Sequence, residues 1–251
     1  MNAAALKLRH APIVEAVVDI DCDLEPGFDL DAIEWAARER FQDRYPKFQK
    51  RYLQELKIET KAAALSQFSA RNAVQALQFF HDDKAQLVQM RVQGFSFNRL
   101  KPYSSLDDYL PEIRRTWQSY LEMAAPVSTR LVRLRYINRI LLPTEAGKVE
   151  LDEYLKIGPR LAHEKALEFT GFLVQHKAME KDTDHQVNLV LTSQDPENEK
   201  LPVILDIGVA SPLREEPGNW AVIRRTVDSL RGLKNRIFLN TLTDKCIQLF
   251  Q

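Results

Sequence analysis

The sequence predicts an α+β protein built from two similar halves, each a curved antiparallel sheet covered by a long helix, in a pseudo-duplicated, helix-grip-like arrangement. One observation is a series of runs in which apolar and polar residues alternate, as they do in half-buried strands. Another is a helical segment that occurs twice, as IRRTWQSY at 113–120 and IRRTVDSL at 223–230. Each copy follows several strand-like runs, so the order of elements repeats along the chain.

The predicted halves are residues 1–145 and 146–251, packed as one unit. The boundary is placed where Pro143 and Gly147 interrupt the chain after its strongest strand-like run. A chain of 251 residues is long enough to bury a large core without disulfide bonds. No short-period repeat occurs, which argues against a solenoid or a propeller.

The first half opens with a strand-like run, IVEAVVDIDCD, whose two faces differ in chemistry. Alternate positions from Val14 to Cys22 are apolar, whereas Glu15, Asp19 and Asp21 place carboxylates on the other face. This alternation predicts a half-buried strand with an acidic outer face.

A helix and three more strand-like runs follow. The helix begins after a cap at Asp29 or Asp31 and reaches about Tyr45. Gly94 is interpreted as a bulge or bend in the last of the runs, which span residues 52–60, 73–81 and 86–98. The next helix, over 103–124, has Ser105 as a candidate cap, because Asp108 follows it as in a capping box with a shorter acid. Its apolar stripe consists of Leu106, Leu110, Ile113, Trp117 and Leu121.

The run STRLVRLRYINRILLP at 128–143 is the strongest strand and carries the first candidate site. One face is expected to be buried, with Val132, Leu134, Tyr136, Asn138 and Ile140. Arg133, Arg135 and Arg139 share the other face, and three guanidinium groups repel one another unless anions lie between them. The acidic face of the first strand could supply those anions. Alternatively, the arginines bind an anionic ligand such as a phosphate or a nucleic-acid backbone, or form a protein interface.

The second half repeats the order of the first. A short helix is expected near 151–157, followed by strand-like runs at 166–179, 186–193 and 203–210. Asn219 is a candidate cap for the IRRTVDSL helix, and Gly232 a candidate for its C-terminal end. A further short helix and an apolar tail close the chain.

Two further places could carry chemistry. FSFNRLKPYSS at 95–105 combines aromatic residues with Asn98, Arg99 and Tyr103 at a strand-to-helix junction, a mixture that can stack on and neutralise a ligand. The same segment could equally contribute to the core. Asp206 lies inside the apolar run VILDIGVA, where a carboxylate either has a shifted pKa or makes a structural hydrogen bond.

Composition and missing motifs narrow the function. Lys plus Arg and Asp plus Glu are each 35, and a dedicated nucleic-acid coat is usually basic. No phosphate loop, dinucleotide fingerprint, kinase set or zinc-protease motif occurs, so no cofactor is predicted. His176 should face Leu189 rather than His185, so no metal site is expected. Whether the chain is an enzyme stays open.

Location is predicted from the cysteines and from the hydropathy of the chain. Two isolated cysteines, Cys22 and Cys246, fit a reducing cytosol. The first ten residues lack the apolar run of a signal peptide, and no stretch approaches the ~18 apolar residues of a membrane span. These features predict a cytoplasmic protein without a membrane segment.

Four segments in this order resemble a bacterial family of about this length. They are RHAPIVEAVVDI, FSFNRLKPYSSLDDYLPEI, RLVRLRYINRI and NRIFLNTLTD. The family is sporadically distributed and has no assigned function, so the resemblance implies no catalytic residues. It implies an accessory gene, such as one in a stress, toxin–antitoxin or phage-defence locus.

Three function classes follow. The first is a non-catalytic ligand- or protein-binding module with a protein partner or a homo-oligomeric state. The second is an enzyme that acts on nucleic acid or a nucleotide through a cleft of arginines and carboxylates. The third is a nucleic-acid binder that uses the arginines of the 128–143 strand and those of the two repeated helices.

Overall fold

The computed structural model describes residues 8–59, 67–145, 147–160 and 170–251. Nine strands of these residues form one antiparallel sheet in the order β2-β3-β4-β5-β1-β6-β9-β8-β7. The strands are β1 (Ile13–Asp23), β2 (Lys47–Glu59), β3 (Gln67–Phe80), β4 (Gln86–Arg91), β5 (Gly94–Leu100), β6 (Ser128–Pro143), β7 (Leu173–Met179), β8 (Gln186–Ser193) and β9 (Lys200–Glu215).

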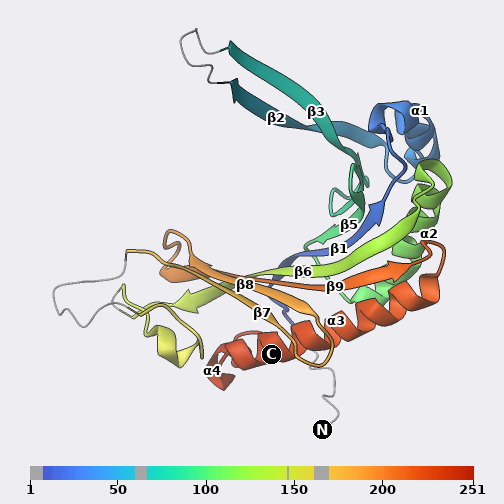
Figure 1. Ribbon diagram of the computed structural model, residues 1–251. Helices are drawn as coiled ribbons and strands as arrows, with labels where there is room; N and C mark the ends of the chain where they lie inside the picture. The colour runs from blue at the N-terminus through green and yellow to red at the C-terminus, as the bar shows by residue number, and fades with distance from the viewer. Residues whose placement is uncertain (1–7, 60–66, 146, 161–169) are drawn as a thin grey trace.

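The helices are α1 (Leu30–Phe41), α2 (Leu106–Ala124), α3 (Trp220–Thr241) and α4 (Asp244–Gln248), with a 3₁₀ turn η1 (Leu151–Glu153). Figure 1 shows that α1, α2 and α3 lie along the convex side of the strongly curved sheet. The class α+β is thus confirmed, but the strands form one continuous sheet rather than two separate ones. No helix of the described residues is long and apolar enough to cross a membrane.

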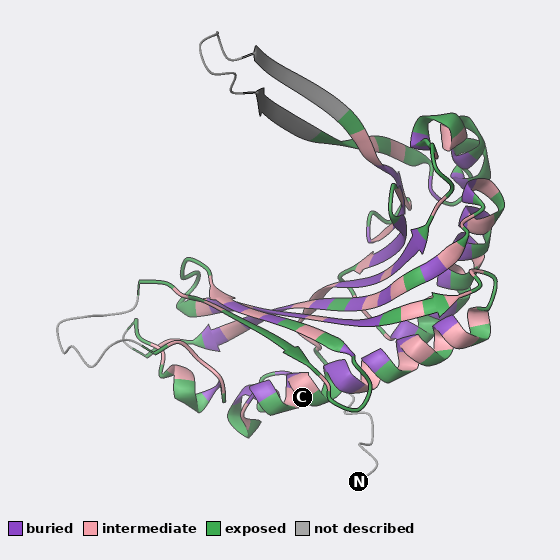
Figure 2. Ribbon diagram, viewed as in Figure 1, coloured by how far each residue is buried: buried purple, intermediate pink, exposed green. Residues whose placement is uncertain are grey.

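The two central strands behave as their alternation predicts. In β1, Ala16, Val18 and Ile20 are buried beneath the helices, and in β6 the same holds for Val132 and Leu134. Because β1 pairs with β6, the acidic face of β1 lies beside the arginine face of β6. The core lies between this sheet and the helix layer, and Figure 2 shows buried residues concentrated along the central strands.

The repeated helical segments occupy α2 and α3 and bury equivalent positions. Ile113 and Trp117 of α2 are buried, as are Ile223 and Val227 of α3. Phe95 packs edge-on against Trp117 at a ring-centroid distance of 5.7 Å. The Trp117 indole donates a hydrogen bond to the carbonyl oxygen of Pro217 at 3.2 Å, so α2 is tied to the segment that leads into α3.

Local signals placed most helix starts correctly. The Asp29 side chain accepts from the amide of Asp31 at 3.0 Å and caps α1. Ser105 caps α2 in the same way, accepting from the amide of Asp107. Asn219 stands at the start of α3 but makes no side-chain cap.

Several sequence predictions differ from the structure or reach beyond it. Helix α1 ends at Phe41, short of Tyr45. The run 86–98 is two strands, β4 and β5, joined by a tight turn at Val92 and Gln93. Helix α3 continues through Gly232 to Thr241, because Leu233 and Phe238 extend its buried stripe beyond the glycine. The run 166–179 contains β7, but its first residues, 166–169, lie outside the described residues.

Candidate functional site

The concave side of the sheet carries no helix of the described residues, and we call it the open face (Figure 1). Side chains reach it from alternate positions of each strand. Most of its central residues are polar or charged, yet several of these are nearly buried, among them Ser96 and Asp206. Such groups must be satisfied by hydrogen bonds, and their partners define the candidate site.

Four amide side chains form a hydrogen-bonded row across the open face, which we call the amide row. Gln49 of β2 donates to Gln78 of β3 at 2.8 Å, and Gln78 donates to Gln89 of β4 at 2.8 Å. Gln89 donates to Asn98 of β5 at 2.9 Å, and Asn98 donates to the carboxylate of Glu15 on β1 at 2.7 Å. The row therefore crosses five neighbouring strands and ends on a negative charge.

The register of the sheet produces this row. Gln49, Gln78 and Gln89 stand directly opposite one another on β2, β3 and β4. An amide has two N–H donors and two acceptor lone pairs, and each inner member of the row uses one of each within it. A connected chain of hydrogen bonds fixes the side chains in place, so the row is a preorganised polar surface.

Ion pairs occupy the centre of the open face. Arg91 of β4 contacts the carboxylate of Asp21 at 2.6 Å and that of Asp19 at 3.7 Å. Arg133 contacts Asp19 at 3.4 Å and Asp21 at 3.9 Å from the other side. The acidic first strand therefore neutralises Arg133. This matches the alternative in which carboxylates of the first strand lie between the arginines.

The other two predicted arginines, Arg135 and Arg139, find partners elsewhere. Arg135 donates to Asp206 of β9 through Nη2 at 2.6 Å and through Nε at 3.0 Å. The apolar run around Asp206 thus holds a carboxylate for a structural ion pair. Arg139 lies 2.7 Å from Glu197, in the segment between β8 and β9. All three predicted arginines reach the open face, each beside a carboxylate.

Asn98 joins this face as part of the amide row, whereas Arg99 and Tyr103 lie on the helix side. Arg99 contacts Asp83 at 2.9 Å, and its guanidinium group lies over the ring of Tyr109 of α2. The hydroxyl of Tyr103 lies 3.0 Å from that of Tyr136. The sheet therefore divides the six predicted site residues, because successive residues of β5 point to opposite faces.

Sequence reasoning missed Lys234, a buried lysine of α3. Its side chain is on the helix side, with Nζ 4.0 Å from the centre of the Tyr136 ring, and only 9% of the residue is exposed. Burial, together with the charge of Arg231, lowers the pKa of Lys234 to about 8. The signal was present in the sequence, because Lys234 continues the buried stripe Ile223, Val227 and Leu230 at helical spacing.

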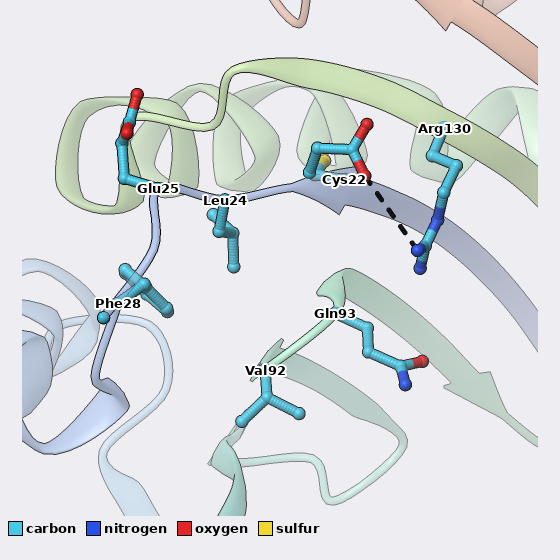
Figure 3. Close-up of a pocket in the computed structure, with 9 residues that line it drawn as sticks. Cys22, Leu24, Glu25, Phe28, Val92, Gln93 and Arg130 are labelled. Atoms are coloured by element: carbon cyan, nitrogen blue, oxygen red, sulfur yellow. Dashed lines mark ion pairs between the residues drawn. The ribbon is translucent and has the colours of Figure 1, made fainter.

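A hollow of about 340 Å³ lies where β1 leaves the sheet, between Leu24, Phe28 and the β4–β5 turn (Figure 3). Arg130 and Asp23 form an ion pair at 3.9 Å at its rim. Burial and the neighbouring Asp21 raise the pKa of Cys22 to about 12, so its thiol stays protonated near neutral pH. A second hollow, of about 600 Å³, lies beside Trp35 between α1 and β2.

The placement of His176 is as predicted. His176 stands opposite Leu189 in the β7–β8 pair, and His185 approaches Glu180 at 3.2 Å in the turn between these strands. Within the described ranges, no group of three or more His, Cys, Asp or Glu side chains is arranged to hold a metal ion.

The fold and this site define the class of the protein as an α+β protein with a one-sided antiparallel sheet. No family model, no curated protein and no solved structure matches the chain.

Asp21→Ala is expected to lower the free energy of unfolding by about 3 kcal/mol, because it leaves the largely buried Arg91 without its closest anion. Chemical denaturation measures the change in the free energy of unfolding. Asp23→Ala is the control, since Asp23 lies two residues on in the same strand and is more than half exposed. Equal effects of the two substitutions would contradict the assignment of Asp21 as the central anion.

Proposed function

We propose that the protein is a non-catalytic binding module that holds a protein partner against the open face. One observation carries the proposal. The helices cover one side of the sheet, while the other presents a broad, preorganised surface of paired charges and hydrogen-bonded amides. Preorganised groups reduce the entropy lost on binding.

The shape and charge of the face favour a protein over other partners. The two hollows described above lie at the end of β1 and beside α1, away from the amide row, so the face offers a broad surface rather than an enclosed small-molecule pocket. Arg133, Arg135 and Arg139 each contact a carboxylate, which reduces their attraction for a phosphate backbone. A polar, charge-balanced surface is the usual chemistry of a non-obligate protein interface.

Native mass spectrometry of gently purified, untagged protein tests this proposal. One variant combines Arg135→Gln with Asp206→Asn, which removes one ion pair from the open face but keeps its hydrogen-bonding groups. The control is Arg114→Gln, at an exposed position of helix α2. We expect a second polypeptide bound to the wild type and to Arg114→Gln, and at least about tenfold less on the open-face variant. A bare chain throughout, or equal loss in both variants, would contradict the proposal.

An enzyme that acts on nucleic acid or a nucleotide is the second candidate. It is favoured by the meeting of Arg91 and Arg133 with Asp19 and Asp21 on one face. It requires these groups to bind a phosphate, so oligonucleotide binding should fall steeply with salt and fall further in Arg133→Gln. Salt-independent binding, or none, argues against it.

The finer architecture is also part of the proposal. We infer a duplication in which β1 and β6 are equivalent central strands, because β1 pairs with β5 before α2 and β6 pairs with β9 before α3. The helix-grip comparison and the division at residue 145 remain predictions. A cytoplasmic location is also a prediction, and the buried free thiols Cys22 and Cys246 support it. Membership of the sporadically distributed bacterial family, which implies an accessory gene, is a further prediction.

A further inference from the structure

The free edge of β7 is an exposed strand edge in the C-terminal part of the sheet. β7 is the last strand of the sheet, and among the described residues it pairs only with β8. Every residue of β7 except Val174 is exposed. Leu173 is 70% exposed and Met179 is 63% exposed, at opposite ends of the strand. Exposed edge strands with apolar side chains readily pair with another chain.

The backbone hydrogen bonds show which groups of β7 point outward. The amide of Glu180 donates to the carbonyl of His185, and the carbonyl of Phe172 accepts from the amide of Ser193. Even-numbered residues therefore turn their backbone groups towards β8. Since these groups alternate along an antiparallel strand, the N–H and C=O groups of Leu173, Gln175, Lys177 and Met179 point to the free edge.

The side chains of the same four residues lie on the open face. Gln175 stands opposite Val190, which stands opposite Asp206 of β9, and Asp206 reaches the open face. Side chains at every second position of a strand share a face, so Leu173 and Met179 join Gln175 there. Two large apolar groups thus flank the centre of the strand at equal spacing.

This pattern is self-complementary about His176. When a second copy of β7 pairs antiparallel around this centre, Leu173 faces Met179 of the other copy and Gln175 faces Lys177. Each of these pairs exchanges two backbone hydrogen bonds. A shift of two residues in one direction places Lys177 opposite Lys177, and a shift in the other places Leu173 opposite Lys177. The centred register alone joins the apolar groups and separates the ammonium groups.

We propose that two copies of this chain associate through β7 in this register, which joins their sheets across a twofold axis. The contact is isologous, because the same strand serves both copies. It places the open faces of the two copies side by side on one continuous surface. The inference is independent of the partner proposed for that face.

Analytical ultracentrifugation of the full chain over a concentration series tests the dimer and its register. We expect a wild-type dimer, and a dissociation constant raised about tenfold or more by Leu173→Lys or by Met179→Glu. The double variant Leu173→Lys with Met179→Glu places a lysine opposite a glutamate at both ends, and we expect its dissociation constant to return to within about threefold of the wild type.

Two further variants separate pairing from folding. Gln175→Pro removes an outward N–H and the side-chain hydrogen bond from Gln175 to Asn188, but no backbone hydrogen bond to β8. It should therefore abolish the dimer while circular dichroism shows a folded chain. Val127→Lys changes an exposed apolar residue outside β7 and should leave the dimer intact. A monomeric wild type, a dimer insensitive to Leu173→Lys and Gln175→Pro, or a double variant that stays monomeric would overturn the proposal.

Discussion

Gly94→Ala is expected to lower the free energy of unfolding by about 4 kcal/mol, an effect comparable with the loss of a large core side chain. Gly94 has a φ of +139°, which L-residues rarely adopt. A Cβ atom at this position would lie 2.1 Å from the carbonyl oxygen of Ile20 and 2.9 Å from the Cα atom of Asp21. Both are backbone atoms of β1, so β5 must move away from β1 to relieve the clash.

The displacement would also disturb the open face, because Gly94 stands opposite Asp21 and Asn98 follows on the same strand. Thermal and chemical denaturation measure the effect. Gly218→Ala is the control, since no atom lies within 4 Å of its added Cβ. A Gly94→Ala variant as stable as the wild type would contradict the close β1–β5 contact.

Lys234→Met is expected to raise the free energy of unfolding by about 2 kcal/mol at pH 7. At a pH below its folded pKa of about 8, Lys234 is charged although it is buried. In the unfolded chain the pKa of this lysine is about 10.5. The fold is thus penalised at neutral pH, and the contact with the Tyr136 ring offsets part of the penalty. Met has a similar shape and carries no charge.

The sign of the pH dependence follows from these pKa values. Between about pH 8 and 10.5 the unfolded chain binds the proton and the folded chain does not, so wild-type stability gains relative to the variant as pH rises. The advantage of Lys234→Met should therefore shrink above pH 8. Burial raises the pKa of Tyr103, Tyr136 and Cys246, but these groups are common to both proteins and cancel in the difference.

Denaturation across this pH range tests the prediction. Lys101→Met, which removes one exposed positive charge in a loop, is the matched control. A constant difference between Lys234→Met and the wild type at every pH would contradict a proton equilibrium at Lys234.

The sequence predicted the local elements well because local physics determines them. Alternation in β1 and β6 assigned both faces of each strand, and the side chains of Asp29 and Ser105 marked two helix starts. The charge complementarity of the two strands was also visible, and their pairing confirms it.

Non-local relationships could not be read from the chain. The amide row joins Gln49 to Glu15 through β3, β4 and β5, and only the strand order and register bring these residues together. Alternation within one strand gives the face of a residue but not its neighbour on the next strand. Arg135 could therefore not be assigned to Asp206, which lies 71 residues away in sequence.

Hydroxyl-radical footprinting of the gently purified protein, before and after bound material is stripped at high salt, tests most directly whether the open face is the binding surface. Leu100 and Ile137 stand on either side of Glu15 on the open face and report on it. Trp35, which is 75% exposed on α1, reports on the helix side. The account predicts that Leu100 and Ile137 become more reactive after stripping while Trp35 is unchanged. Increased reactivity at Trp35 with none at Leu100 or Ile137 would contradict it.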